Sequence, residues 1–192
     1  MILGKTEEMV ENRDLFEKLA RVKIVAMDVD GTFTDGTLYY DHSGNVMKGF
    51  ASHDGLGMDL LHRAGIKRGF ITGRRDKSTE ERARYLQVDF YFCGVGDKSE
   101  ALRNLSEKYS VSISDILYIG DDLNDYTAFK TAGITIAVGD AAEEIRDIAD
   151  YVTVSHGGHG AVREAINLLL RAKGYDMIAL WMTVKDCPAE TQ

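Results

Sequence analysis

Two carboxylates stand at the end of an apolar segment, in Asp28-Val29-Asp30-Gly31, and their spacing points to chemistry. The preceding run, Ile24-Val25-Ala26-Met27, is typical of a buried strand. Because side chains alternate along an extended chain, we expect Asp28 and Asp30 to project to the same side while Val29 turns into the core. Two like charges this close repel each other unless a cation or a shared proton offsets them. Asp and Gly also form ordinary turns after strands, so the tetrapeptide alone leaves a structural interpretation open.

Two further polar clusters follow predicted strands. Thr72-Gly73-Arg74 could bind a phosphoryl oxygen through its hydroxyl and backbone amides, although an N-cap for the next helix also explains a Thr-Gly pair. Lys98 falls at the start of a predicted helix, where the macrodipole disfavours a cation. A solvated surface lysine is the default interpretation, but this position suggests that Lys98 holds phosphate.

The segment Gly120-Asp121-Asp122-Leu123-Asn124-Asp125 crowds further negative charge at the end of another predicted strand. Capping of the next helix accounts for one of its carboxylates but not for all of them. Since the carboxyl ends of neighbouring parallel strands meet at one edge of a sheet, we expect Asp28, Asp30 and Asp121 to come together. An all-oxygen site without His or Cys ligands favours Mg²⁺ over zinc.

The elements that must position these residues alternate between strand-like and helical patterns. After a helix over about 7–20, predicted strands span 23–27, 66–71, 89–92, 116–119, 134–138 and 151–154. Predicted helices centre on 58–63, 77–86, 99–109, 124–130, 142–148 and 161–172. This alternation predicts an α/β fold, a three-layer, doubly wound parallel sheet with its ligand site at the carboxyl ends of the strands.

One segment interrupts this alternation of strands and helices as an insertion within the main domain. Two strand-like runs flank Asp41-His42-Ser43-Gly44, which predicts a β-hairpin at about 36–50, standing over the mouth of the site as a small flap. We expect an N-terminal helix (1–21), a main domain (22–174) and a C-terminal tail (175–192). The apolar run at 177–182 in the tail is expected to pack on the core or on a neighbour.

Composition narrows the class of protein. The chain has 192 residues, of which 44% are hydrophobic, and this suits one domain with a full core. The net charge of −8 argues against a general nucleic-acid binder, and no stretch is long enough for a membrane span. The N-terminus is too short and polar for a signal peptide. Only Cys93 and Cys187 are present, which argues against a disulfide framework and fits a reducing cytoplasm. We therefore expect a cytoplasmic protein that binds neither nucleic acid nor membrane.

The polar clusters, taken in order, resemble the motifs of the haloacid dehalogenase superfamily of phosphatases. The match is closer with one branch, the 3-deoxy-D-manno-octulosonate 8-phosphate phosphatases. It rests on the hairpin in place of a large cap, on Phe50…Asp54-Gly55-Leu56-Gly57, and on Gly157-Gly158-His159-Gly160-Ala161-Val162-Arg163-Glu164. The likeness covers about residues 22–174.

The resemblance implies a role for each motif residue. Asp28 is the nucleophile that forms an aspartyl phosphate, and Asp30 is the acid and base that serves the leaving sugar oxygen and then the attacking water. Mg²⁺ is bound by Asp28, Asp121 and the backbone carbonyl of Asp30. Thr72 and Lys98 hold the remaining phosphoryl oxygens. A carboxylate is a weak nucleophile, so this chemistry requires the phosphate charge to be neutralised.

Supporting and substrate-binding residues are also implied. Asp122 and Asp125 would orient Lys98 and the waters of the metal. The residues implied for substrate binding are Asp30, Ala51, Ser52, His53, Asp54, Gly55, Arg74, Arg82 and Lys98. Guanidinium groups suit bidentate binding of a sugar-acid carboxylate or of the phosphate, although Arg82 is equally well explained as a solvated helix residue.

The sequence departs from the family pattern at two positions. The family usually has Arg directly before the Asp-Gly pair, where this chain has His53, and a second family Arg is here Asp59. A histidine is a shorter, titratable donor, so it could recognise a different group or a longer sugar acid. The expected substrate is therefore a phosphorylated sugar acid, first 3-deoxy-D-manno-octulosonate 8-phosphate and alternatively a nonulosonate 9-phosphate.

The resemblance also implies a homotetramer in which the hairpins assemble and a neighbouring segment covers each site. The exposed-looking Tyr39, Tyr40 and Phe50 fit this expectation, because a small hairpin cannot enclose a sugar phosphate unaided. Two other classes use similar residues. One is a receiver-type phospho-acceptor domain, against which the Asp-x-Asp-Gly and the hairpin argue, and the other is a non-catalytic regulatory module.

Overall fold

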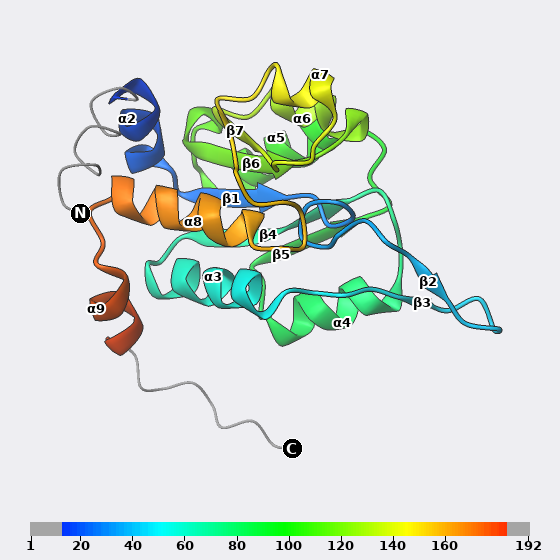
Figure 1. The fold of residues 1–192 in the computed structure, drawn as a ribbon. Coiled ribbons are helices and arrows are strands. Elements are labelled where there is room, and N and C mark those ends of the chain that lie inside the picture. Colours follow the sequence, from blue (N-terminus) through cyan, green and yellow to red (C-terminus); the bar gives the residue numbers. More distant parts are fainter. Residues whose placement is uncertain (1–12, 184–192) are drawn as a thin grey trace.

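Six parallel strands form the central sheet of the computed structural model, which describes residues 13–183 (Figure 1). The strands are β1 (Ile24–Met27), β4 (Lys67–Thr72), β5 (Phe90–Cys93), β6 (Ile116–Gly120), β7 (Ile134–Ala137) and β8 (Tyr151–Val152), in the spatial order β5-β4-β1-β6-β7-β8. All strand pairs in this sheet are parallel. The predicted α/β architecture is confirmed.

The centre of the sheet is buried on both faces. Every residue of β1, β6 and β7 is buried, as is usual for parallel strands covered by helices on both sides. Met27 at the end of β1 pairs with Phe70 of β4 and Ile119 of β6, so these three strands end at the same level. The segments that follow β1, β4 and β6 therefore meet at one edge of the sheet.

Helices cover both faces of the sheet. They are α2 (Arg13–Arg21), α3 (Ser52–Arg63), α4 (Lys77–Tyr85), α5 (Lys98–Tyr109), α6 (Tyr126–Phe129), α7 (Glu143–Arg146), α8 (Ala161–Ala172) and α9 (Met177–Met182), with short 3₁₀ turns η1 (Ile113–Asp115) and η2 (Leu123–Asp125). Figure 1 shows α3, α4 and α8 on one side of the sheet and α5 and α6 on the other. None of the helices in the described range combines the length and the apolar character needed to cross a membrane.

Helix α3 begins earlier than the sequence pattern predicts, at Ser52 rather than close to Met58. Its first turns contain Gly55 and Gly57, and glycine lowers helix propensity. The glycines are used for close packing instead. A Cβ on Gly57 would lie 2.9 Å from Ile166 Cδ1 of α8, and a Cβ on Gly55 would lie 2.4 Å from Arg82 Nη2. Three other predicted elements, α6, α7 and β8, are shorter than predicted.

The hairpin is present, but its strands are short. β2 (Tyr39–Tyr40) pairs antiparallel with β3 (Val46–Met47), and the hairpin projects away from the sheet (Figure 1). The side chains of Tyr39, Tyr40 and Met47 are 55%, 61% and 59% exposed. The hairpin therefore presents an apolar surface that nothing in the described residues covers.

The tail contains a short helix that packs on the main domain. Leu180 of α9 is buried, and the Arg63 guanidinium lies 4.3 Å from the centre of the Trp181 ring. Arg63 also donates a hydrogen bond to the Trp181 carbonyl oxygen at 2.9 Å. The prediction that this apolar run packs on the core or on a neighbour is confirmed for Met177 and Leu180, which pack on the core, whereas Ile178 and Met182 are 77% and 67% exposed. The start of the predicted N-terminal helix, before residue 13, and Cys187 lie outside the described residues.

Candidate active site

Asp28 and Lys98 form a buried ion pair at the end of β1. Asp28 is 2% exposed and Lys98 is 1% exposed, and Lys98 Nζ lies 2.9 Å from Asp28 Oδ1. Lys98 is the first residue of α5, where Asp97 caps the helix by accepting a hydrogen bond from the Ser99 amide. The lysine thus extends from a helix start into the site, as the sequence suggested. Burial and the charge of Asp125 raise the pKa of Asp28 to about 6, against the lowering effect of Lys98.

Asp125 holds Lys98 from the opposite side. Its Oδ1 lies 2.5 Å from Lys98 Nζ and accepts a hydrogen bond from the Tyr118 hydroxyl at 2.6 Å. Its Oδ2 accepts from the Asp121 amide at 2.9 Å. Burial lowers the pKa of Lys98, but the charges of Asp28 and Asp125 outweigh it and raise that pKa above its usual value. Lys98 therefore remains a cation between two carboxylates.

An all-oxygen group is present where the sequence predicts a metal. Carboxylate oxygens of Asp28, Asp121 and Asp125 lie within 4.8 Å of one another. Asp121 Oδ1 accepts a hydrogen bond from the Thr32 hydroxyl at 2.7 Å. Burial and the charge of Asp28 raise the pKa of Asp121 to about 8. Such crowding of buried carboxylates fits a hard divalent cation, and Asp28 and Asp121 have more free oxygen lone pairs to offer than Asp125 has.

Close backbone packing keeps these carboxylates together. Gly31 has φ of +93°, and a Cβ there would lie 2.0 Å from Asp121 Oδ2, so only glycine admits that carboxylate. A Cβ on Gly157 would lie 1.7 Å from the Gly31 carbonyl oxygen, and the Gly158 amide donates to the Thr32 carbonyl oxygen at 3.2 Å. The Gly-rich loop before α8 therefore supports the loop that follows β1.

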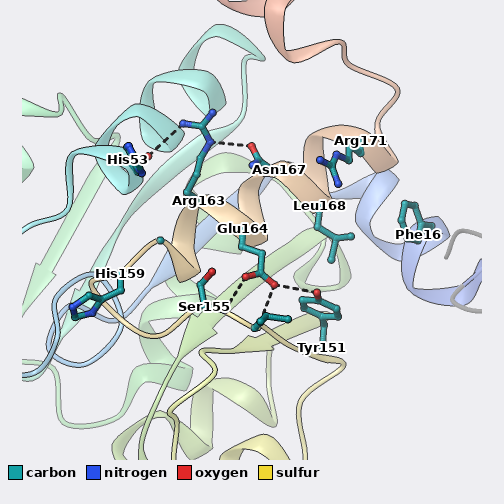
Figure 2. Close-up of a pocket in the computed structure, with 12 residues that line it drawn as sticks. Phe16, His53, Tyr151, Ser155, His159, Arg163, Glu164, Asn167, Leu168 and Arg171 are labelled. Carbon is teal, nitrogen blue, oxygen red and sulfur yellow. Dashed lines mark hydrogen bonds between the residues drawn. The ribbon is translucent and has the colours of Figure 1, made fainter. Parts of the chain in front are cut away.

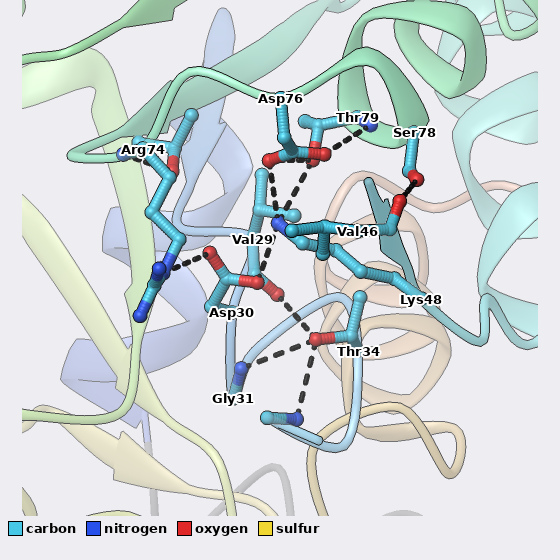
Figure 3. Close-up of polar contacts among 12 residues, drawn as sticks. Val29, Asp30, Gly31, Thr34, Val46, Lys48, Arg74, Asp76, Ser78 and Thr79 are labelled. Carbon is cyan, nitrogen blue, oxygen red and sulfur yellow. Dashed lines mark hydrogen bonds and ion pairs between the residues drawn. The ribbon is translucent and has the colours of Figure 1, made fainter. Parts of the chain in front are cut away.

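Asp30 has partners different from those of Asp28, and Figure 3 shows Asp30 between Lys48 and Arg74. Lys48 Nζ lies 2.6 Å from Asp30 Oδ1, and Arg74 Nε lies 3.5 Å from Asp30 Oδ2. The chain turns after Asp28, so the two side chains do not form one cluster, and Asp30 does not belong to the metal-binding group found among the described residues. The ligand predicted from Asp30 is its backbone carbonyl oxygen, not its side chain. The position of the Asp30 side chain therefore does not contradict that prediction.

Lys48 is a site residue that the sequence interpretation missed. It follows β3, and its side chain is fully buried. A signal for it was present in the sequence, because Val46, Lys48 and Phe50 alternate along the chain and so share one face of an extended segment. In the structure these three residues, backbone included, are half-buried, while Met47 and Gly49 are exposed. A lysine in register with two apolar inward-facing residues indicates a buried ammonium group that needs partners.

Thr72 and Asp122 occupy the expected ends of strands. Thr72, at the end of β4, is 1% exposed, and its hydroxyl oxygen accepts a hydrogen bond from the Arg74 amide at 3.2 Å. Asp122 is exposed, and its carboxylate accepts from the Leu123 amide at 2.7 Å as the cap of η2. Asp125 therefore contacts Lys98, while Asp122 caps η2.

The residues predicted to bind substrate surround the first turn of α3. Ala51 is its extended N-cap, and Ser52, His53, Asp54 and Gly55 form the first turn. The Asp54 carboxylate is buried and accepts hydrogen bonds from the Gly160 amide at 3.2 Å and the Arg163 amide at 2.7 Å. Asp54 thus caps α8 from α3. The structure shows this contact as a link between two helices.

His53 and Arg82 lie on different sides of this turn. His53 lines a hollow of about 610 Å³ along α8, together with His159 and Arg163 (Figure 2). Arg82 lines another hollow, of about 410 Å³, with Ser52 and Gly55. The Arg82 guanidinium lies 5.6 Å from the Phe50 ring centre and 5.5 Å from that of Tyr85. Arg74, by contrast, is beside Asp30 and has a half-exposed side chain.

Comparisons with known proteins agree with this arrangement. Residues 94–166 match the family model described as haloacid dehalogenase-like hydrolase. The chain is 37% identical over 158 residues to the 3-deoxy-D-manno-octulosonate 8-phosphate phosphatase KdsC of Haemophilus influenzae, covering 82% of this chain and 88% of that one. It is 36% identical to KdsC of Escherichia coli K12 over 161 residues, covering 84% and 86%.

Solved structures show the same fold. The 3-deoxy-D-manno-octulosonate 8-phosphate phosphatase of Moraxella catarrhalis, in complex with a magnesium ion, a phosphate ion and KDO, has a TM-score of 0.84 and 38% identity, covering 88% of this chain and 97% of that one. A putative haloacid dehalogenase superfamily hydrolase of subfamily III A from Legionella pneumophila has a TM-score of 0.86 and 34% identity, covering 94% and 99%.

Proposed function

Because the chain belongs to the 3-deoxy-D-manno-octulosonate 8-phosphate phosphatases of the haloacid dehalogenase-like hydrolases, and is therefore a phosphatase, we propose that it hydrolyses a sugar-acid phosphate. The first candidate substrate is 3-deoxy-D-manno-octulosonate 8-phosphate. One observation carries the proposal above all. The buried carboxylate of Asp28 lies 2.9 Å from the buried ammonium of Lys98, beside a second carboxylate, Asp121, that can share a cation with it.

In the first step, an oxygen of Asp28 attacks the phosphorus atom, and the bond from phosphorus to the sugar oxygen breaks. Asp30 supplies a proton to the departing sugar oxygen. In the second step, water attacks the phosphorus atom of the aspartyl phosphate and gives its proton to Asp30, which restores Asp28 and releases phosphate. Lys98 and Thr72 stabilise the phosphoryl oxygens, and Asp125 keeps the Lys98 ammonium in place.

The proposed cofactor is Mg²⁺, held by the carboxylates of Asp28 and Asp121 and by the backbone carbonyl of Asp30. When bound, it neutralises phosphoryl charge and so allows a carboxylate to approach phosphorus. The donor set is entirely oxygen, as this hard cation prefers. Lys98 lowers the pKa of both Asp28 and Asp121, but burial and the nearby carboxylate charges outweigh it, so these two groups would be stabilised by a cation.

Substrate recognition is proposed for residues 51–55 and for Arg74 and Arg82. Arg74 already lies beside Asp30, so it can bind an anionic group of a substrate whose ester oxygen faces Asp30. His53 stands where the family usually has Arg, and it opens into the hollow along α8 (Figure 2). Because a histidine is a shorter donor than the usual arginine, it fits a longer sugar acid, and a nonulosonate 9-phosphate is the second candidate.

A phosphate-release panel at saturating Mg²⁺ tests the proposal. We expect multiple turnovers, with kcat/KM for one of the two sugar-acid phosphates well above that for p-nitrophenyl phosphate. If neither sugar-acid phosphate exceeds p-nitrophenyl phosphate, both substrate assignments fail. A single turnover would instead indicate a receiver-type phospho-acceptor, and no release at all would indicate a regulatory module.

The nucleophile is tested separately. Asp28→Asn removes the attacking carboxylate, so we expect turnover to be lost while the melting temperature of the protein remains close to that of the wild type. Asp14→Asn is the matched control, because Asp14 is an exposed carboxylate on α2 that pairs with Lys18 and not with any residue of the site. Retained phosphate release by Asp28→Asn would contradict the assignment.

A further inference from the structure

The ammonium group of Lys48 is enclosed by acceptors from two different loops (Figure 3). Its side chain has no exposed surface. Nζ lies 2.6 Å from Asp30 Oδ1, 2.7 Å from Asp76 Oδ2 and 3.1 Å from Thr79 Oγ1. Lys48 donates hydrogen bonds to Asp76 and Thr79, and its contact with Asp30 Oδ1 is a short ion pair with a carboxylate oxygen that has no hydrogen-bond donor of its own among the described residues. The two hydrogen bonds therefore hold the ammonium group in place beside Asp30.

This burial is exceptional for a surface element such as the hairpin. Removing a charged group from water carries a free-energy penalty of several kcal/mol that only good pairing offsets. Apart from Lys98 in the active site, the other ion-paired lysines in the described residues stay in contact with solvent, since Lys18, Lys23 and Lys67 keep 33%, 62% and 48% of their side chains exposed. The placement of Lys48 therefore calls for a reason beyond solubility or ordinary surface pairing.

Residues at the N-cap and in the first turn of α4 bind Lys48 and the base of the hairpin. Asp76 is the N-cap of this helix and accepts a hydrogen bond from the Thr79 amide at 2.9 Å, so its carboxylate is fixed. The Ser78 hydroxyl donates to the Val46 carbonyl oxygen at 2.5 Å, which fastens the base of the hairpin to the same helix turn. A rigid helix start thus holds the lysine, and the lysine in turn holds one oxygen of Asp30.

The alternative support for Asp30 is much weaker. Arg74 lies 3.5 Å from the other carboxylate oxygen, and 53% of its side chain is exposed. An exposed arginine in a loop also has to be free to meet a substrate anion. Lys48 is consequently the one fixed cation beside Asp30 in the described part of the chain.

We propose that Lys48 is the positioning residue for Asp30, holding its carboxyl group in the orientation that delivers a proton to the leaving sugar oxygen. This rests on the acid and base role proposed for Asp30. Proton transfer requires hydrogen-bond reach between carboxyl group and leaving oxygen, and a small displacement of a catalytic group lowers the rate strongly. Because Lys48 follows β3, the same contact links the position of the hairpin to the chemical step.

The reactivity of two leaving groups separates this role from a general structural one. An alkoxide leaving group such as a sugar hydroxyl needs a proton, whereas p-nitrophenolate leaves without one. For Lys48→Met we expect kcat/KM for the sugar-acid phosphate to fall about 100-fold or more, as for loss of a general acid. For p-nitrophenyl phosphate we expect a fall of less than about five-fold, because proton donation contributes little to that step.

Three further variants complete the experiment. Asp30→Asn should show the same split between the two substrates, and Lys48→Arg should recover part of the activity on the sugar-acid phosphate. Lys77→Met is the matched control, since Lys77 is an exposed lysine at the start of the same helix, and both rates should stay at the wild-type level. If Lys48→Met alone does not fold, the double variant Lys48→Met/Asp76→Asn is assayed in its place, because it also removes the Asp76 carboxylate that the first substitution leaves without its lysine.

The outcomes distinguish the two proposals. Suppose that Asp30→Asn lowers the rate on the sugar-acid phosphate far more than the rate on p-nitrophenyl phosphate, while Lys48→Met lowers both rates equally or changes neither. The positioning role is then overturned, and the proposed function stands. If Asp30→Asn itself shows no split, the acid role of Asp30 fails and the role of Lys48 fails with it. A split in both variants, with recovery by Lys48→Arg, supports the positioning role.

Discussion

At the scale of single residues, the surroundings of each aspartate decide what it does. Asp28 is paired with Lys98 in a buried site, and Asp30, two positions later, is paired with Lys48 at a more exposed one. Two carboxylates of the same type can take different roles when their environments differ in this way. Asp121, without a lysine of its own, is the carboxylate whose charge most needs a cation.

The pH dependence of stability tests the metal site. Burial and the charge of Asp28 raise the pKa of Asp121 to about 8, so below this pH the metal-free native state holds a proton that the unfolded chain, with a pKa of 3.8, does not. Stability of the metal-free protein should therefore fall as pH rises from 6 to 8, by at most about 1.4 kcal/mol per pH unit for one proton. Mg²⁺ needs the deprotonated carboxylate, so its stabilising effect should grow over the same range.

Melting temperatures at pH 6, 7 and 8, with and without Mg²⁺, measure both effects. Asp121→Asn is the control, and it should reduce the pH slope and the gain from Mg²⁺ together. A gain from Mg²⁺ that shrinks as pH rises would contradict the assignment of Asp121 as a ligand.

At the scale of elements, the site depends on contacts between helices that approach each other at their ends. The first turn of α3 carries Asp54, whose carboxylate accepts hydrogen bonds from the amides of Gly160 and Arg163 at the start of α8. These amides have no partners within their own helix. The contact fixes α3 against α8, and with it the direction in which His53 points (Figure 2).

Replacing Asp54 should destabilise the protein. Asp54→Ala leaves two amides without acceptors at a buried position, so we expect the free energy of unfolding to fall by about 1–3 kcal/mol. Urea denaturation measures this change. Glu81→Ala is the control, because Glu81 of α4 pairs with Arg84 where both side chains are exposed, and it should lower stability by less than about 1 kcal/mol. Equal effects of the two variants would contradict the capping role.

At the scale of the whole molecule, the hairpin has apolar surface that no other part of the described chain covers. It projects from the sheet with Tyr39, Tyr40 and Met47 more than half exposed (Figure 1). Apolar surface of this kind usually marks an interface. Since Lys48 and Val46 join the hairpin base to α4, an assembly of hairpins would also hold the mouth of the site in place.

We predict a homotetramer assembled through these hairpins. Tyr39→Ser/Tyr40→Ser removes aromatic surface from the expected interface and should lower the molar mass measured by light scattering after size exclusion. Tyr126→Ser, at an exposed tyrosine outside the hairpin, should leave the mass unchanged. A wild-type protein that is monomeric at micromolar concentration would contradict the prediction.

The fold could be predicted from the sequence because its signals are local. The apolar runs at 24–27 and 116–120 are buried strands, as their continuous hydrophobicity indicates. The helix predicted at 161–172 has those bounds in the structure. The start of α3 was missed because Gly55 and Gly57 weaken the helical signal, and their value lies in contacts with Arg82 and Ile166 that the local sequence does not show.

The sequence by itself determined which residue types follow each strand, and parallel strand ends then brought Asp28 and Asp121 together. Only the tertiary structure decided how the two carboxylates of the first motif differ. Lys48 meets Asp76 across 28 positions, and Asp54 meets Gly160 across 106. Such partners are selected by the packing of whole elements, because the free energy of a buried ion pair or cap depends on the groups around it and not on spacing along the chain.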